Sequence, residues 1–137
     1  MLQLQRQQWL EMVGHSLDCA PEEACGLLTG PPGDTVTSFW PCPNTDRSAR
    51  TYAIDGRDLL RVERALETEG KGGEILGVMH SHTHTDAYPS PTDVERAALL
   101  GDWHFFIVSL RHPDPQARSY RITEGRVTEE PIVLGPG

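Results

Sequence analysis

Apolar and polar positions recur along the chain with two different periods, which predicts a mixture of helices and strands. In residues 3–18, apolar side chains recur at helical spacing opposite glutamine and arginine, so we expect an amphipathic helix. A second helix is predicted to begin after an N-cap at Asp55 and to stop at Gly70. A third is predicted over 90–101, with proline in its first turn and glycine at its end.

Short runs of apolar, β-branched and aromatic residues predict strands. These runs cover residues 21–30, 34–42, 74–82, 103–110, 117–122 and 127–134. The first two and the last two are expected to form hairpins, because turn residues separate them. The third, "EILGVMHSH", is typical of a strand covered on both faces and should lie centrally. The order of elements predicts an α/β (α+β) fold class: one domain, residues 1–137, with a single mixed β-sheet flanked by helices.

Charge and composition narrow the classes of protein that remain. The chain carries a formal net charge of −8, and its lysine and arginine residues are scattered, so nucleic acid is not an expected partner. Three cysteines without a CxxC pair suit a reducing compartment. The start "MLQLQRQQWL" lacks the plan of a signal peptide, and no apolar run reaches the roughly 18 residues needed to cross a bilayer. We therefore expect a cytoplasmic protein that does not span a membrane.

The segment "MHSHTHTDAYPSPTDV" carries the candidate chemistry. His80 and His82 are two positions apart on a predicted strand, so their side chains share one face. Asp93 supplies a third ligand if the intervening loop folds the start of the third helix back onto the end of that strand. Two imidazoles and one carboxylate oxygen are typical of catalytic zinc, which keeps one position open for water. A further carboxylate must then move protons, and Glu22 or Glu23, at the start of the first strand, could reach the water.

Several of these residues also allow a purely structural interpretation. Ser90, Pro91 and Asp93 have the arrangement of a helix start, with Ser90 as N-cap and Asp93 at the third helical position. His84 could continue the face of the two preceding histidines and form a three-histidine site, which would leave Asp93 as a cap only. The polar residues after His84 indicate that the strand has ended, which favours a place in the cleft wall or in solvent. Cys25 lies in an apolar run without an activating partner and is predicted to be a core thiol.

The spacing of five residues matches a known motif: Glu23, His80, His82, Ser90 and Asp93. This pattern resembles the JAMM motif of the MPN+ zinc metalloproteases, which consists of a glutamate, then His-x-His, seven residues, a serine, two residues and an aspartate. The resemblance covers nearly the whole chain, including "EACGLLTG" around the glutamate, "SARTYAID" before the second helix, and "RSYRI" and "VTEEP" near the end. In these stretches the chain is most similar to the small bacterial Mec subgroup, although threonine stands where many relatives have proline after the second histidine.

The resemblance implies the MPN/JAMM fold, which is cytidine-deaminase-like, and one Zn²⁺ per chain held by His80, His82 and Asp93. It also implies that Glu23 takes a proton from the zinc-bound water, which attacks the scissile carbonyl. Ser90 would stabilise the resulting oxyanion through its hydroxyl. Glu23 is preferred to the glutamate before it, because the glutamate of the family directly precedes the "ACG" segment.

The activity implied by the resemblance is hydrolysis after the C-terminal Gly-Gly of a ubiquitin-like or sulfur-carrier protein, including release of cysteine from a carrier–cysteine adduct. The leaving amine and the oligomeric state stay open, with a homodimer among the alternatives. Two other functions are compatible with parts of the motif: a catalytically silent MPN-type binding scaffold, and a histidine-rich metal-binding protein. Substitution of Glu23 separates them, because only the enzyme would keep zinc and lose cleavage.

Overall fold

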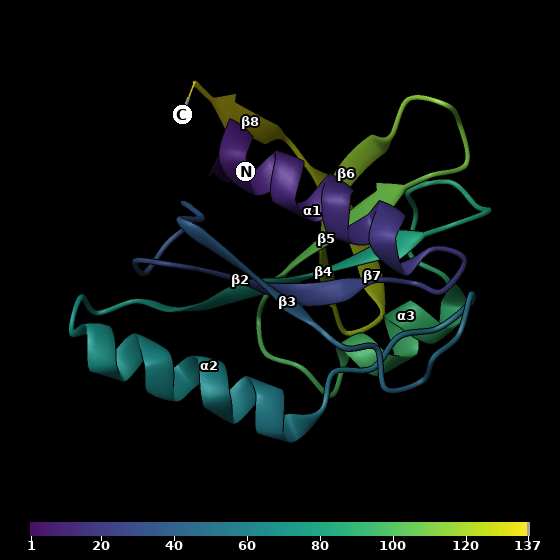
Figure 1. Ribbon diagram of the computed structural model, residues 1–137. Coiled ribbons are helices and arrows are strands. Elements are labelled where there is room, and N and C mark those ends of the chain that lie inside the picture. Colours follow the sequence, from purple (N-terminus) through teal and green to yellow (C-terminus); the bar gives the residue numbers. More distant parts are fainter. Residues whose placement is uncertain (137) are drawn as a thin grey trace.

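The computed structural model describes residues 1–136, and its centre is a six-stranded mixed β-sheet in the order β3-β2-β4-β5-β6-β7 (Figure 1). β4 and β5 run parallel, and the other neighbouring pairs are antiparallel. The elements in chain order are β1 (Leu2–Gln5), α1 (Arg6–Cys19), β2 (Cys25–Gly30), β3 (Ser38–Cys42), α2 (Gly56–Glu69), β4 (Glu74–His82), α3 (Pro91–Ala97), β5 (His104–Ser109), β6 (Gln116–Thr123), β7 (Arg126–Glu130) and β8 (Ile132–Gly135). This architecture confirms the predicted α+β class with a mixed sheet flanked by helices.

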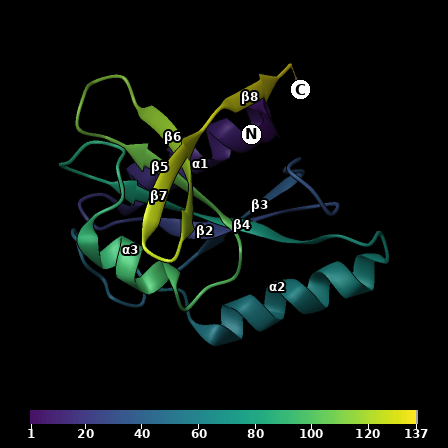
Figure 2. The same ribbon diagram turned by 180° about the vertical axis from the view of Figure 1, so that it is seen from behind.

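Helices cover the sheet on both faces. α1 lies on one face, and α2 and α3 lie on the other (Figures 1 and 2). Side chains along β4 alternate between the two layers, so that Met79 joins the core with α1 whereas Val78 joins the core with α2. His80 and His82 keep the period of Val78 and therefore belong to the face of α2 and α3. Within residues 1–136, no helix combines the length and the apolarity that crossing a bilayer requires.

β4 lies at the centre of the sheet, as its continuous apolar run predicted. It is flanked by β2 and β5, and every residue from Leu76 to His82 is buried. Gly77 allows the close approach of β5, because a Cβ at this position would overlap the carbonyl oxygen of His104. The strand that ends in the two histidines is therefore fixed by hydrogen bonds along both edges and by packing.

The predicted signals for the second helix and for the hairpins are confirmed. α2 begins after Asp55, whose carboxylate accepts a hydrogen bond from a first-turn amide at 2.8 Å, and it stops at Gly70, which is left-handed. β2 pairs with β3 and β6 pairs with β7, both antiparallel. The second hairpin turns at Glu124 and Gly125, which have φ values of 52° and 77°.

The first and last elements differ from the prediction. The first helix starts only at Arg6, because the residues before it form β1. The expected last strand breaks at Pro131, which has no amide hydrogen to donate to a sheet. The part after the break, β8, pairs in parallel with β1 and forms a separate two-stranded sheet that the prediction of a single sheet omits. α3 ends at Ala97, before the predicted stop at Gly101.

A buried polar cluster joins β5, β6 and β7. Glu130 Oε2 lies 2.7 Å from Nδ1 of His104 and accepts a hydrogen bond from the Ser119 hydroxyl at 2.9 Å. Its other oxygen lies 3.0 Å from the amino nitrogen of Met1, and the second ring nitrogen of His104 lies 3.0 Å from Asp34. Burial opposes ionisation of Glu130, but these partners outweigh it and lower the pKa of Glu130 to about 2.

Glu130→Gln is expected to lower the free energy of unfolding by about 2 kcal/mol at neutral pH. The pKa of Glu130 in the folded protein lies below its ordinary value of 4.5, so its stabilising contribution is complete above pH 4.5 and is lost as the pH falls toward 2. Urea unfolding at several pH values should therefore show wild type and variant converging over this range. Glu129→Gln is the control, because the neighbouring side chain is exposed and should contribute less than about 1 kcal/mol. Equal losses in both variants would contradict the prediction.

Candidate metal centre

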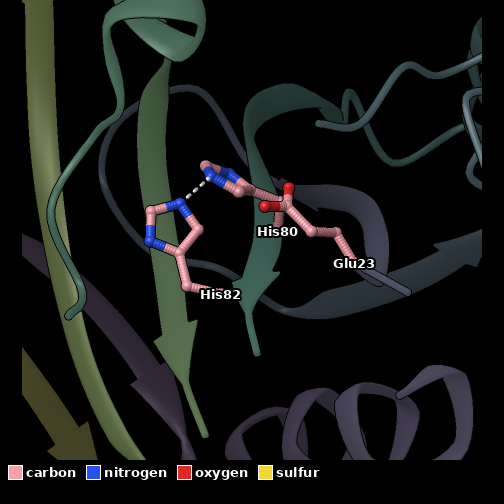
Figure 3. A group of neighbouring side chains, drawn as sticks. All are labelled: Glu23, His80 and His82. Atoms are coloured by element: carbon pink, nitrogen blue, oxygen red, sulfur yellow. Dashed lines mark hydrogen bonds between the residues drawn. The ribbon is translucent and has the colours of Figure 1, made fainter. Parts of the chain in front are cut away.

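The end of β4 presents His80 and His82 side by side in the interior. Their Nε2 atoms lie 3.1 Å apart, and both side chains are buried. Figure 3 shows the two rings, with the carboxylate of Glu23 beside the ring of His80. Ser81, between the histidines, hydrogen-bonds the backbone of Ala24 through both its amide and its hydroxyl. The period of the strand thus gives the two imidazoles a common face, as predicted.

Asp93 reaches the same point from the first turn of α3. Its Oδ2 atom lies 3.0 Å from Nε2 of His80 and 3.2 Å from Nε2 of His82. The same atom accepts a hydrogen bond from the Ser90 amide at 2.9 Å, while the Ser90 hydroxyl accepts one from the Asp93 amide at 3.0 Å. This is a capping box, so the helix-start interpretation of Asp93 and its convergence with the histidines are both correct.

The loop between β4 and α3 is anchored by side chains of neighbouring strands. Ser109 donates to a loop carbonyl at 2.6 Å, and the Tyr120 hydroxyl donates to another. The carbonyl of Asp86, between these two, accepts a hydrogen bond from Nδ1 of His82 at 2.7 Å. A carbonyl oxygen only accepts, so Nδ1 of His82 carries a proton, and the neutral ring would offer the lone pair of its Nε2 to a metal ion.

Glu23 approaches the histidines from the chain just before β2. It is buried, whereas Glu22 is exposed. Its amide donates to the Ser48 carbonyl at 2.8 Å, and its carbonyl accepts from Nδ2 of Asn44 at 3.0 Å, so the backbone is fixed on both sides. A carboxylate oxygen of Glu23 and one ring nitrogen of each histidine lie within 4.8 Å of one another. Its Oε1 atom has no hydrogen-bond partner among residues 1–136, which leaves a free acceptor in the buried group.

The structure does not bring two other residues considered from the sequence into this group. His84 is exposed, and its Nδ1 lies 2.8 Å from the hydroxyl of Thr83. Cys25 is fully buried, and its thiol donates to the Pro43 carbonyl at 3.6 Å. Burial strongly raises the pKa of Cys25, so the thiol is not an ionised nucleophile. It is the core residue that the sequence predicted.

The charges of the group follow from burial and from mutual hydrogen bonds. Burial lowers the pKa of His80, so this imidazole is neutral. Burial also opposes charge on His82, but hydrogen bonds with Asp93 and Asp86 raise its pKa. The carboxyl of Asp93 is buried as well, yet both histidines hold its pKa well below the usual range. Burial raises the pKa of Glu23 to about 8.

This donor set fits a zinc ion. Two imidazole nitrogens and one ionised carboxylate oxygen, 3.0–3.2 Å from one another, match the ligands of catalytic zinc. The second nitrogen of His82 is engaged by a backbone carbonyl, as is usual for a metal-ligating histidine. Glu23 lies next to these donors with an acceptor atom free, which is the position that a proton-accepting base requires.

Sequence reasoning missed Tyr52 and the pocket beside it. The Tyr52 ring stacks on the ring of His80, with centroids 4.3 Å apart and planes inclined by 16°. Tyr52 also lines a largely apolar pocket of about 330 Å³, together with side chains such as Leu59 and Trp103. No local pattern marks this tyrosine, because its contact joins segments that are distant in the sequence. Its place in the "SARTYAID" stretch was the only available signal.

Solved structures define the class of fold. A protein from Desulfitobacterium hafniense, determined in solution, is similar at a TM-score of 0.89 and 35% identity, covering 100% of this chain and 94% of that one. A JAB1/MPN domain protein from Archaeoglobus fulgidus is similar at a TM-score of 0.63 and 19% identity, covering 97% of this chain and 99% of that one. The fold is therefore that of a JAB1/MPN domain.

The family model described as prokaryotic homologs of the JAB domain matches residues 5–123, and the chain belongs to this family. A CysO-cysteine peptidase of Mycobacterium tuberculosis is 44% identical over 123 residues, which are 88% of this chain and 82% of that protein. A desampylase of Haloferax volcanii is 31% identical over 116 residues, which are 83% of this chain and 79% of that protein. These relatives make the chain a hydrolase of the JAB family.

Proposed function

We propose that this protein is a zinc-dependent peptidase that cleaves after the C-terminal Gly-Gly of a ubiquitin-like or sulfur-carrier protein. The observation that carries the proposal is the convergence of His80, His82 and Asp93 beside the buried carboxylate of Glu23. The names of two relatives, a CysO-cysteine peptidase and a desampylase, support the substrate class.

His80, His82 and Asp93 would hold one zinc ion per chain through the three atoms that already converge. When bound, zinc lowers the pKa of water to about 7 and polarises a carbonyl oxygen. The chain contributes ligands that are ordered in advance: β4 holds both imidazoles, the Asp86 carbonyl fixes the ring of His82, and the capping box fixes the carboxylate. Ligands held in this way lose little freedom when the ion binds.

Glu23 would move the proton of the reaction. As the water oxygen bonds to the scissile carbonyl carbon, the Glu23 carboxylate takes one proton from it. When the C–N bond breaks, Glu23 passes this proton to the departing amine. Burial raises the pKa of Glu23 to about 8, and a bound cation nearby would lower it again. The group could thus both take and release a proton near neutral pH.

Ser90 would stabilise the negative charge that develops on the carbonyl oxygen. Its oxygen accepts a hydrogen bond from the Asp93 amide at 3.0 Å, which orients the hydroxyl. The hydroxyl hydrogen is donated to no atom of residues 1–136, so it is available to the developing oxyanion.

A Gly-Gly tail suits such a site, because glycine has no side chain that would obstruct a narrow cleft and an extended tail can pair with a strand edge. Cysteine, a lysine side chain or another peptide could each serve as the leaving amine.

We also propose that the chain forms one domain and that it acts in the cytoplasm. The compartment is supported by the three cysteines, which are all free thiols, as is usual in a reducing environment: Cys19, Cys25 and Cys42.

The test is cleavage of two substrates, a carrier protein ending in Gly-Gly joined to cysteine and the same carrier joined to a peptide, with products weighed by mass spectrometry. Cleavage after Gly-Gly is expected, and it should stop with chelator and return with added zinc. A carrier ending in Ala-Ala is the matched control and should resist cleavage. A protein that holds no zinc and leaves both substrates intact would be a binding scaffold instead. Zinc binding without cleavage would indicate a metal-binding protein.

A further inference from the structure

We infer that Tyr52 is the positioning residue for His80 and holds its imidazole in the metal-binding orientation by stacking. The inference rests on the proposed zinc site and begins from a difference between the two histidines. Nδ1 of His82 donates to the Asp86 carbonyl at 2.7 Å. Nδ1 of His80 is buried and has no hydrogen-bond partner among residues 1–136. Among the same residues, only the Nε2 side of the His80 ring has polar contacts, with Asp93 and His82, so the orientation of the rest of the ring needs a further cause.

The stacking contact between the rings of Tyr52 and His80 supplies this cause. A metal-ligating histidine usually has its second nitrogen held by a hydrogen bond, which fixes the rotation of the ring. At His80, the Tyr52 ring lies nearly parallel to the imidazole, with centroids 4.3 Å apart and planes inclined by 16°. Rotation of the imidazole about its Cβ–Cγ bond would drive its edge into the tyrosine ring. The stack thus restricts the same torsion that the hydrogen bond restricts in His82.

Tyr52 is itself held by the segments that build the site. The residue is buried, with only 7% of its surface exposed. Its backbone carbonyl accepts a hydrogen bond from Arg96 at 2.9 Å, and Arg96 lies on α3, the helix that carries the carboxylate ligand. The Asn44 amide donates both to the carbonyl of Thr51 at 2.9 Å and to that of Glu23 at 3.0 Å. The tyrosine ring therefore has a fixed place relative to the base and to the third ligand.

The aromatic ring, rather than the hydroxyl, accounts for the inferred role. The contact with His80 is made by the face of the tyrosine ring, which lies nearly parallel to the imidazole. Phenylalanine presents the same flat face to His80. Tyr52→Phe should therefore preserve the stack, whereas Tyr52→Leu should remove it while filling much of the same volume.

The test measures cobalt(II) binding, because this ion occupies zinc sites and its visible absorption reports on ligand geometry. Tyr52→Leu is expected to raise the Kd for cobalt(II) about tenfold or more and to change the absorption spectrum, since partners behind ligating histidines contribute about 10- to 100-fold in metal affinity. Tyr52→Phe should keep the wild-type spectrum and a Kd within about threefold of the wild-type value.

Phe105→Leu is the matched control. Phe105 belongs to the same core cluster as Tyr52 and is 3% exposed, but on β5 it lies opposite Val78 rather than against a histidine. This variant should lose stability without a change in cobalt(II) affinity or spectrum. Circular dichroism follows the folding of each variant, and Tyr52→Met replaces the leucine variant if that one does not fold.

Three outcomes would overturn the inference. A folded Tyr52→Leu variant with the affinity and spectrum of wild type would overturn it and leave the zinc site standing. A Tyr52→Phe variant as weak as Tyr52→Leu would overturn it too, because the hydroxyl would then be the group that matters. A wild-type protein that binds no cobalt(II) would remove the proposed site and the inference together.

Discussion

Substitution of Glu23 by glutamine is expected to reduce kcat by about 1,000-fold, because a general base and acid typically contributes 100- to 10,000-fold and Glu23 would serve as both. Glutamine fills the same volume but cannot take a proton from water. Zinc binding should persist, since the three proposed ligands are other residues. The measurement is kcat on the carrier substrate together with zinc content by native mass spectrometry.

Glu22→Gln provides the matched control for this substitution. It makes the same chemical change one residue away, on a side chain that is exposed rather than buried with the histidines. Its kcat should equal that of wild type. A Glu23→Gln variant with the kcat of wild type, or an equal loss of kcat in both variants, would exclude Glu23 as the proton carrier.

Asp93→Asn is expected to weaken zinc binding more than about 100-fold and to abolish hydrolysis with it, because a neutral amide is a much poorer ligand than a carboxylate. The substitution keeps a carbonyl oxygen that can accept the hydrogen bond from the Ser90 amide. The start of α3 should therefore stay capped. Zinc affinity by competition with a chelator, and helix content by circular dichroism, measure the two effects separately.

Ser90→Ala removes a capping group and keeps the carboxylate, so it serves as the control for zinc binding. It removes the hydroxyl that accepts from the Asp93 amide and should lower the free energy of unfolding by about 1 kcal/mol. The carboxylate of Asp93 remains, so zinc affinity should fall at most about fivefold, far less than in Asp93→Asn, because only a capping energy of about 1 kcal/mol is lost. If Asp93→Asn bound zinc as tightly as wild type, Asp93 would be a cap alone and the ligand set would have to be sought elsewhere.

The sequence predicted those parts of the molecule that leave a local pattern. The apolar run before His80 indicated a central strand, and the period of two indicated a shared face for the histidines. The serine and proline before Asp93 indicated a helix start, and the structure has a capping box there. Each of these signals depends on neighbours within a few residues, so it can be recognised in the sequence without knowledge of the tertiary contacts.

Features that depend on distant partners could not be predicted in this way. β8 pairs with β1, which lies near the other end of the chain. The local pattern instead predicts one continuous strand through Pro131, because the residues on both sides of this proline are typical of a strand. The partners of Glu130 come from three other segments, the N-terminus, β5 and β6, so no local spacing in the sequence predicts this buried cluster. Tyr52 likewise meets His80 only after the loop before α2 has folded against the sheet.

The proposed role of Asp93 as a ligand, added to its observed role as a helix cap, has a consequence for the dynamics of the protein. α3 has seven residues and is too short to persist without outside support, part of which comes from the Asp93 cap. An ion that binds only the folded arrangement would increase the population of that arrangement, and by linkage any fraying of the helix would weaken binding of the ion. Metal content and the local order of this helix would thus increase and decrease together, because one equilibrium determines both.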